Sequence, residues 1–376
     1  MTVSATQWKP TFRPLINFPF HAFSMDWQDS VVDAARTYLA RQDEWGECAR
    51  RLRFNLGKIQ YPEALEADLL LPVVPRPPQG SFAAVDGGLG AAAFHGLDLL
   101  ALKALAVRFD YQEGRLSGHA YLPSAHPPVK VHTTWGLDGF EQMRFSSLMR
   151  LRAELSAALM AAEQWKPSFL LLDGSIAPLV SDKPPEDSEL KALYGDVASL
   201  YQKLYSTCAQ SSINLVGITK DSRGRRFLDL ISRASPESAE SLAAASDTSF
   251  LDLLLSEGER TFCMRYSVAP TANPVLKDLG EWASRILAFY IKPTAGDRPL
   301  RVEFLSTASL YQEVAEVISG LSHLAPHYAY PAILIEADLR AAVGAEEVEQ
   351  VVADLSTRIG RKRPLMPLRR DSRPFR

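Results

Sequence analysis

The chain has 376 residues, of which 47% are hydrophobic and 23% are charged. These proportions are ordinary for a globular protein and exclude a chain that is disordered or collagen-like throughout. The formal net charge is −3, from 41 basic and 44 acidic residues. This balance excludes a nucleic-acid binder that is cationic over its whole surface, but it permits a local basic groove.

The N-terminus and the cysteines indicate a cytoplasmic protein. The first 20 residues lack a basic start followed by an apolar run, so we expect no secretory signal. The most apolar stretch, residues 89–107, is interrupted by charged and polar side chains and makes a poor membrane span. Cys48, Cys208 and Cys263 lie far apart, which predicts buried free thiols rather than disulfides or a thiolate zinc site.

The first eighty residues predict an extension ahead of the main domain. Apolar residues at helical spacing favour a helix over residues 27–56. The segment LPVVPRPPQG (71–80) is rich in proline and predicts a linker. We therefore expect an N-terminal helical extension with this linker over 1–80, a main domain over 81–357, and a basic C-terminal tail over 358–376.

The main domain shows a mixed order of strands and helices. Its first strand is the apolar run SFAAVDGG, and an antiparallel meander is the expected arrangement of the short strands that follow. A leucine stripe predicts a long helix over 138–164, and FLLLD (169–173) has the character of a strand buried on both faces. Further strands are expected at 104–111, 117–123, 129–135, 214–220, 261–268, 288–293 and 301–305. Further helices are expected at 189–208, 310–321, 331–343 and 346–355. This order predicts an α/β fold without simple alternation.

Two of the predicted strands end in an aspartate followed by glycine. Asp86 precedes Gly87 and Gly88, and Asp173 precedes Gly174. Glycine permits a sharp turn or the close approach of a ligand, and an ordinary Asp-Gly turn is the simpler explanation of either motif alone. Because ligands bind at the carboxyl ends of strands in open α/β sheets, the recurrence favours a functional role for both aspartates.

Two further carboxylates lie on predicted helices. Glu154 is flanked by small residues, but from the helix alone a solvated glutamate paired with Arg150 is the favoured interpretation. Asp338 shares a predicted apolar face with Leu334 and Ala341, where a lone carboxylate is costly unless it is paired or binds a metal. A ligand role is therefore favoured for Asp338, with a buried salt bridge as the alternative.

Four carboxylates from two strands and two helices suit a hard divalent cation. Oxygen ligands of this kind favour Mg²⁺ or Mn²⁺, whereas zinc prefers histidine and cysteine. Two such ions ~3.5–4 Å apart promote phosphodiester hydrolysis, one by activating the attacking water and the other by stabilising the leaving oxygen. If Asp86, Glu154, Asp173 and Asp338 converge, the sequence predicts such a centre.

Together these motifs resemble the NurA-type nucleases, a prokaryotic family with a ribonuclease H-like core. The resemblance spans residues 82–343 and is carried by VDGG at Asp86, the RxxxE motif that ends at Glu154, LLLDGS at Asp173, GITKDS around Lys220, RVEF at Glu303 and YPAILIEAD ending at Asp338. It implies a mixed sheet flanked by helices, with an insertion before the last core helix. It also implies that Asp86, Glu154 and Asp173 are metal ligands. Asp338 stands where the family often has histidine, a chemically tolerable change.

The resemblance also implies an activity and partners. The family implies Mn²⁺-dependent 5′ to 3′ exonuclease activity with single-strand endonuclease activity, used to process DNA ends in recombinational repair. For this chain it therefore implies a two-metal DNA nuclease with Mn²⁺, or Mg²⁺, as cofactor. The implied partners are DNA, a HerA-type hexameric ATPase translocase, and a second copy of the chain in a homodimer. No membrane association is expected.

Several cationic and aromatic residues are candidates for contacts with DNA. Lys220 follows a buried strand, where a cation would meet the scissile phosphate, and Arg150 and Arg223 add positive charge. Tyr330, at a predicted strand end, is a candidate for stacking on a base, although packing is also a common role for tyrosine before proline. For Glu303, on a predicted strand, a structural ion pair and a supporting role beside the metal ligands both stay open.

Two other functions are compatible with the same motifs. The Asp-Gly motifs are similar to phosphate loops of actin- or sugar-kinase-like ATPases, but neither has the Gly-Thr continuation and the chain has no P-loop. A non-catalytic partner of a DNA translocase, with a decayed nuclease centre, has only Asp338 in its favour. The presence of Asp86, Glu154 and Asp173 argues instead for an intact enzyme.

Overall fold

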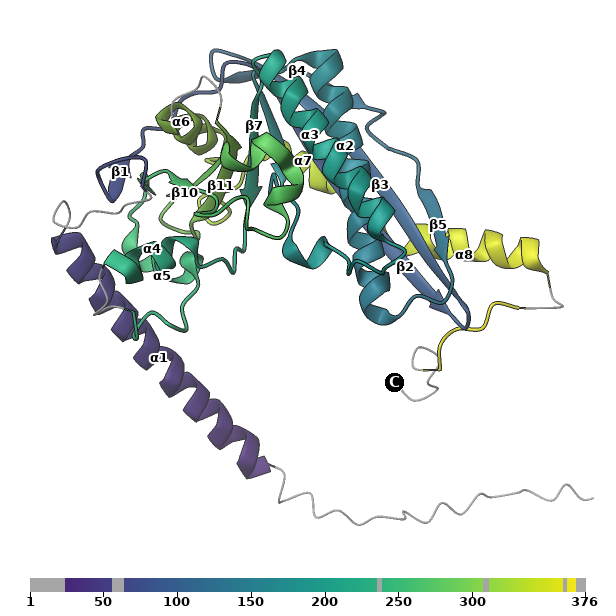
Figure 1. The fold of residues 1–376 in the computed structure, drawn as a ribbon, viewed down its shortest axis with the longest axis horizontal. Coiled ribbons are helices and arrows are strands. Elements are labelled where there is room, and N and C mark those ends of the chain that lie inside the picture. The colour runs from purple at the N-terminus through teal and green to yellow at the C-terminus, as the bar shows by residue number, and fades with distance from the viewer. Residues whose placement is uncertain (1–23, 56–63, 235–238, 307–310, 361–363, 370–376) are drawn as a thin grey trace, which may run out of the picture.

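The fold is built on one mixed sheet. The computed structural model describes residues 24–55, 64–234, 239–306, 311–360 and 364–369. These residues form an eleven-stranded sheet with the order β1-β8-β10-β11-β7-β6-β2-β3-β4, in which β5 also pairs with β3 and β9 with β10 (Figure 1). The neighbours β2, β6 and β7 run parallel, and the other pairs are antiparallel.

The helices and strands follow the predicted order, except that β1 lies at the start of the predicted linker and two short strands, β8 and β9, replace the single strand expected at 261–268. The strands are β1 (Leu70–Pro72), β2 (Gly80–Phe94), β3 (Leu97–Gln112), β4 (Arg115–Leu122), β5 (Lys130–Thr134), β6 (Phe169–Asp173), β7 (Asn214–Thr219), β8 (Glu259–Thr261), β9 (Met264–Arg265), β10 (Ile286–Lys292) and β11 (Leu300–Leu305). The helices are α1 (Ser24–Phe54), α2 (Gly139–Trp165), α3 (Lys191–Gln210), α4 (Arg226–Ala234), α5 (Asp247–Leu254), α6 (Tyr311–Leu321), α7 (Ala332–Ala341) and α8 (Ala345–Ile359), with 3₁₀ turns at Val180–Asp182 and Leu276–Ser284. The leucine-rich helix predicted from position 138 is α2, which Asp138 caps through hydrogen bonds from the N–H groups of Phe140 and Glu141.

Helices cover both faces of the sheet. In β6, Leu170 and Leu172 pack with α2 and α3, whereas Phe169 and Leu171 pack with α6 and α7. The strand is therefore buried on both faces, as its unbroken apolar run predicts. A meander of β2, β3 and β4, followed by α2 and then by the parallel strands β6 and β7, confirms the predicted ribonuclease H-like fold class.

β2 is longer than predicted, and Asp86 lies in its middle rather than at its end. The strand pairs with β3 over its whole length, and the hairpin turns only at residues 95–96. The expectation that the strand ends at Asp86 is therefore wrong, because Gly87 and Gly88 continue the ladder. These glycines instead allow other elements to approach the strand closely.

The N-terminal part packs onto the later half of the chain. Trp45 and Leu52, in the C-terminal half of α1, join a core cluster with side chains of α4, α5 and β10. β1 pairs with β8, so this region contributes a strand to the main sheet. The N-terminal half of α1 extends away from the sheet (Figure 1), and Tyr38 is 62% exposed there. Residues 1–23 of the predicted extension lie outside the described residues.

Three smaller expectations concern the membrane, the thiols and the tail. Among the described residues, no helix is both long and apolar enough to cross a bilayer. Cys48, Cys208 and Cys263 are buried free thiols, as predicted. Within the basic tail, Pro367 forms a β-bridge with Phe94 near the tip of the β2–β3 hairpin. Most basic residues of this tail lie outside the described residues.

Candidate metal centre

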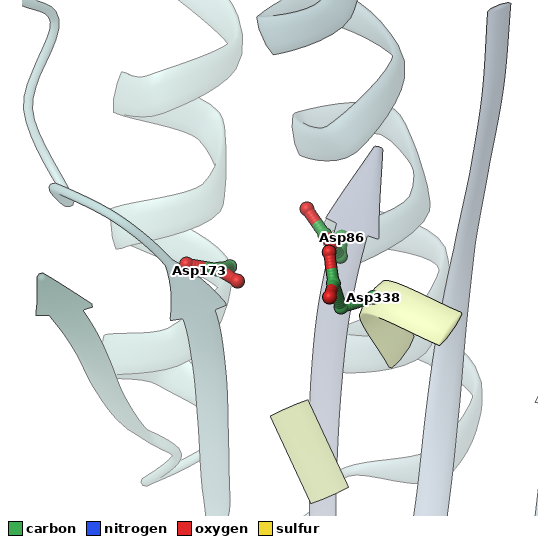
Figure 2. Close-up of side chains that lie close together, drawn as sticks. All are labelled: Asp86, Asp173 and Asp338. Carbon is green, nitrogen blue, oxygen red and sulfur yellow. The ribbon is translucent and has the colours of Figure 1, made fainter. Parts of the chain in front are cut away.

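Three carboxylates converge from three different elements. Asp86 lies in β2, Asp173 at the end of β6 and Asp338 in α7, and one carboxylate oxygen of each lies within 4.8 Å of the other two (Figure 2). The parallel pairing of β2 and β6 sets Val85 opposite Leu172, so the next residues in the two strands, Asp86 and Asp173, are neighbours. Their side chains alternate onto the face that α7 covers.

Gly88 allows α7 to bring Asp338 to this point. A Cβ atom at position 88 would lie 2.1 Å from the carbonyl oxygen of Ala341, so only glycine lets the end of α7 rest on β2. Ala337 and Ala341 carry the packing face of this short helix, and both are fully buried. Asp338 itself is exposed, so the expectation that it lies within the apolar stripe is wrong. It lies beside that stripe and reaches Asp86 from the rim.

Glu154 approaches from the opposite helix layer. A Cβ atom at Gly87 would lie 2.8 Å from Cγ of Glu154, so the glutamate packs directly on the backbone of β2. The residue is only 9% exposed, which excludes the solvated glutamate favoured from the helix alone. Arg150 Nε lies 3.6 Å from its Oε1, and this oxygen has no hydrogen-bond partner among the described residues. Glu154 and Asp173 line one pocket of ≈ 170 Å³, although Glu154 is not within the 4.8 Å group.

The buried acids resist ionisation. Burial, reinforced by the negative charges of Asp173 and Asp338, raises the pKa of Asp86 to about 7 against the opposing Gly87 N–H. Burial also raises the pKa of Glu154 to about 8, with Arg150 opposing and the two aspartates 86 and 173 adding to the rise. A divalent cation favours the ionised form of nearby carboxylates, so a bound metal would offset the cost of ionising Asp86 and Glu154 in these buried positions.

Asp173 is held by two donors. Lys220 Nζ donates to Oδ2 at 2.9 Å, and the Tyr330 hydroxyl donates to Oδ1 at 2.9 Å. The ammonium also lies 4.2 Å from the centre of the Tyr330 ring, within the range of a cation–π contact. Burial alone would lower the pKa of Lys220, but the charge and hydrogen bond of Asp173 outweigh it and the pKa is raised. Lys220 is therefore a cation at the edge of the centre.

Comparison with known proteins identifies the family. The model of the NurA domain matches residues 80–343, which is more than two thirds of the chain. The chain belongs to the NurA domain family. No curated protein sequence matches it.

Solved NurA structures share the fold. The NurA nuclease from Sulfolobus solfataricus superposes with a TM-score of 0.59 at 19% identity, covering 89% of this chain and 97% of that one. A NurA structure bound to dAMP and manganese and another with manganese each give a TM-score of 0.57 at 12% identity. They cover 89% of this chain and 98% and 99% of theirs.

The other residues predicted to contact DNA occupy different surroundings in this NurA-domain protein. Tyr330 is 1% exposed, so its ring is packed in the core and is not presented to a base. Its hydroxyl orients Asp173 instead. Arg150 lies at the rim of the pocket beside Glu154, with 41% of its side chain exposed. Arg223 is exposed on the loop after β7.

Sequence reasoning left the role of Glu303 open, and the structure gives it a partner. Arg301 Nε donates to Oε1 of Glu303 at 2.7 Å, while Ser175 Oγ and the Ile176 N–H donate to Oε2 at 2.6 and 3.2 Å. Glu303 therefore anchors the loop that directly follows Asp173. The sequence does contain a clue, because RVE places two charges in a strand whose other residues are apolar.

The donor set fits a small hard cation in the NurA fold. Oxygens that bind one Mg²⁺ at 2.0–2.1 Å lie roughly 3–4 Å apart, so small rotations of the three aspartates would bring them to one ion. Asp86, Asp173 and Asp338 would hold such an ion. Glu154, whose Oε1 is buried without a hydrogen-bond partner among the described residues, is a further candidate ligand on the other side of β2.

Proposed function

We propose that this chain is a metal-dependent DNA nuclease that hydrolyses phosphodiester bonds at the carboxylate centre. The convergence of Asp86, Asp173 and Asp338 within 4.8 Å, in a chain that belongs to the NurA domain family, carries the proposal. Two similar structures contain manganese, and one of them also contains dAMP. Mn²⁺ is therefore the proposed cofactor, and Mg²⁺ is an alternative with the same ligand chemistry.

The residues of the site have distinct proposed roles. Two bound ions, shared among the three aspartates and Glu154, would supply an activated water and charge compensation at the leaving oxygen. Tyr330 and Lys220 hold the two oxygens of Asp173 in place. The Lys220 ammonium also offers positive charge to the scissile phosphate, and Arg150 and Arg223 offer charge to neighbouring phosphates.

The remaining proposals rest on family membership. They are 5′ to 3′ exonuclease and single-strand endonuclease activity in DNA end processing, a cytoplasmic location, a homodimer, and cooperation with a HerA-type hexameric ATPase. The alternative of an actin- or sugar-kinase-like ATPase loses the support of its first Asp-Gly motif, because Gly87 and Gly88 lie within a strand and not in a loop. The alternative of a non-catalytic scaffold predicts no cleavage with any metal.

The first test is cleavage of end-labelled single- and double-stranded DNA with Mn²⁺, Mg²⁺ or EDTA. We expect metal-dependent cleavage that falls at least ~100-fold in Asp86→Asn and Asp173→Asn, because each variant removes a charged ligand. Asp196→Asn, an exposed carboxylate on α3, is the matched control and should retain full activity. The order of products from each labelled end gives the polarity.

If the isolated protein cleaves no DNA, the same assay is repeated with a HerA-type ATPase present. Cleavage that appears only then, and still depends on Asp173, supports a partner-dependent nuclease. No cleavage with the ATPase present, or cleavage that survives in both aspartate variants, overturns the proposal.

A further inference from the structure

A second pocket lies on the other side of α2 from Asp173. It has a volume of ≈ 330 Å³ and is bounded by α2, β3, β5 and the segment before β5. Its floor is apolar, with Leu102, Met149, Pro127 and Ala157 among its lining residues. Three basic side chains, Lys130, His132 and Arg152, also line it, and among the described residues no aspartate or glutamate does. It shares no lining residue with the pocket of Glu154 and Asp173.

The secondary structure brings these basic residues together. Lys130 and His132 are two residues apart in β5, so both side chains lie on one face of the strand. β5 pairs with β3, where Lys130 is opposite Leu102. On α2, Met149, Arg152 and Ser156 follow the helical repeat and present one stripe to the pocket. The pocket is thus a product of regular elements that are held in register.

Within the described part of the chain, the positive charge of this pocket has no compensating carboxylate. Lys103, Arg150 and Lys220 each pair with an acid, but no ion pair joins Lys130, His132 or Arg152 to a carboxylate within the described residues. Burial lowers the pKa of His132, and the charges of Arg152 and Lys130 lower it further. Repulsion between like charges at a partly apolar pocket destabilises the folded protein, and a bound anion would relieve this repulsion.

We propose that this pocket binds a nucleotide, with Arg152, Lys130 and His132 on the phosphate and the sugar and base against the apolar floor. Arginine matches the geometry of a phosphate with two parallel hydrogen bonds, and lysine adds a compact charge. The volume is at the lower end of the range for small-molecule pockets. A lone phosphate would make no use of the apolar floor, whereas a sugar and base would pack on it. The ligand is either a free nucleotide or one nucleotide unit of a single strand.

The test is calorimetric binding to the full-length protein in EDTA, where no cation holds phosphate at the aspartates. The probes are dTMP, inorganic phosphate and oligothymidylate. We expect saturable binding of dTMP to the wild type. Binding should be at least ~10-fold weaker in Arg152→Glu and in Lys130→Glu, because each replaces a cationic side chain that faces the phosphate with an anionic one. Arg115→Glu makes the same charge change at an exposed site in β4 and should bind as the wild type does.

A second variant separates a nucleotide site from a phosphate site. Ala153 of α2 also lines the pocket. Ala153→Phe fills the apolar part without changing charge, so it should weaken dTMP binding at least ~10-fold and leave the weaker binding of phosphate unchanged. Equal affinity of the wild type for phosphate and dTMP overturns the nucleotide assignment. Unchanged dTMP binding in folded Arg152→Glu and Lys130→Glu, or no dTMP binding by the wild type, overturns the pocket itself.

Competition then assigns the source. Displacement of dTMP by oligothymidylate supports a nucleotide unit of a DNA strand, whereas simultaneous binding supports a free nucleotide. Because the assay contains no metal and no cleavage step, its outcome is independent of the proposed nuclease activity. Thermal unfolding of each variant, compared with the wild type, confirms that a loss of binding comes from the pocket.

Discussion

At the scale of the single residue, Glu154 occupies the least favourable position of the four acids. Its side chain is pressed against the β2 backbone at Gly87, one oxygen has no hydrogen-bond partner among the described residues, and the nearest cation is Arg150 at 3.6 Å. A carboxylate in such surroundings either keeps its proton or gains a cation. The stability of the metal-free protein should therefore depend on pH through this residue.

The expected dependence has a definite sign. The folded protein keeps a proton on Glu154 up to about pH 8, whereas the unfolded chain releases it near pH 4.5, so the free energy of unfolding falls as pH rises between these values. In Glu154→Gln this contribution is absent. Between pH 5.5 and pH 9, the free energy of unfolding of the variant should rise by roughly 3 kcal/mol relative to that of the wild type. Denaturant unfolding in EDTA measures it.

Glu163→Gln provides the control on the same helix. Glu163 forms an exposed pair with Lys203 at 3.5 Å, and such pairs contribute little to stability. Its substitution should leave the pH dependence unchanged. A parallel pH dependence of wild type and Glu154→Gln would show that Glu154 is ionised in the folded protein throughout this range.

The residue scale also shows the limit of sequence reasoning. Asp86, Asp173 and Asp338 could be found because each stands beside an apolar run or stripe, where a carboxylate is unexpected. The surroundings of Glu154 and Tyr330 could not, because they depend on residues distant in the chain. Gly87 lacks the side chain that would exclude Glu154 from its position, and the Tyr330 hydroxyl donates a hydrogen bond to Asp173.

At the scale of the element, the contact between α7 and β2 positions Asp338. The carbonyl oxygen of Ala341 occupies the space that a side chain at position 88 would need. This contact joins backbone to backbone, so no side-chain rotation can relieve an added methyl group. Gly88 is thus required for packing, and the double glycine has a different cause from the turn that its sequence suggests.

Gly88→Ala should therefore destabilise the protein by roughly 2–3 kcal/mol, as overpacking does in well-packed interiors. It should also weaken Mn²⁺ binding, because α7 must shift and carries Asp338 with it. Gly46→Ala is the matched control: a Cβ atom there meets nothing within 4 Å, and alanine in a helix should stabilise by about 0.5–1 kcal/mol. Urea unfolding and Mn²⁺ titration measure the two effects. A Gly88→Ala protein as stable as the wild type would contradict the described contact.

Elements with a strong local pattern were predictable, and those set by tertiary contacts were not. The apolar periodicity of α2 and the unbroken run of β6 were sufficient to locate both. The sequence predicts that β2 ends at Asp86, because the glycines that follow usually interrupt strands, and the approach of Glu154 and α7 explains why glycine occurs within this one. Residue spacing alone does not predict that β2, β6 and α7 converge. That prediction depends on the ribonuclease H-like fold that the family resemblance implies.

At the scale of the whole molecule, hydrogen bonds between buried polar side chains run from α5 through β10 and β11 to the loop after Asp173. Asp247 accepts hydrogen bonds from the Phe227 and Leu228 N–H groups, which begin α4, and from the Tyr290 hydroxyl at 2.8 Å. Tyr290 also accepts a hydrogen bond from Arg301 at 3.0 Å. Through Arg301 these hydrogen bonds then reach Glu303, whose carboxylate anchors the loop after Asp173. The outer cluster of α1, α4 and α5 is thereby connected to the site.

The Arg301–Glu303 pair is the central link, and a double-mutant cycle tests it. Both side chains are less than 10% exposed, so Glu303→Gln leaves a buried guanidinium without its counter-charge and should cost roughly 3–5 kcal/mol. A glutamine has a single acceptor oxygen, so the variant loses the charge and also one of the two sets of hydrogen bonds, either that from Arg301 or those from Ser175 and Ile176. Arg301→Met combined with Glu303→Gln should be less destabilising than the sum of the single changes, with a coupling of at least ~1.5 kcal/mol.

The control is the exposed pair Asp354–Arg358 in α8, where Asp354→Asn should change stability by less than ~0.5 kcal/mol. Additive effects of Arg301→Met and Glu303→Gln in urea unfolding would contradict a direct pair. Mn²⁺ titration of the same proteins provides the second readout. If the pair anchors the loop, Glu303→Gln lowers Mn²⁺ affinity even at temperatures where the variant is fully folded, because a neutral amide holds Ser175 and Ile176, in the loop after Asp173, less firmly than a carboxylate does.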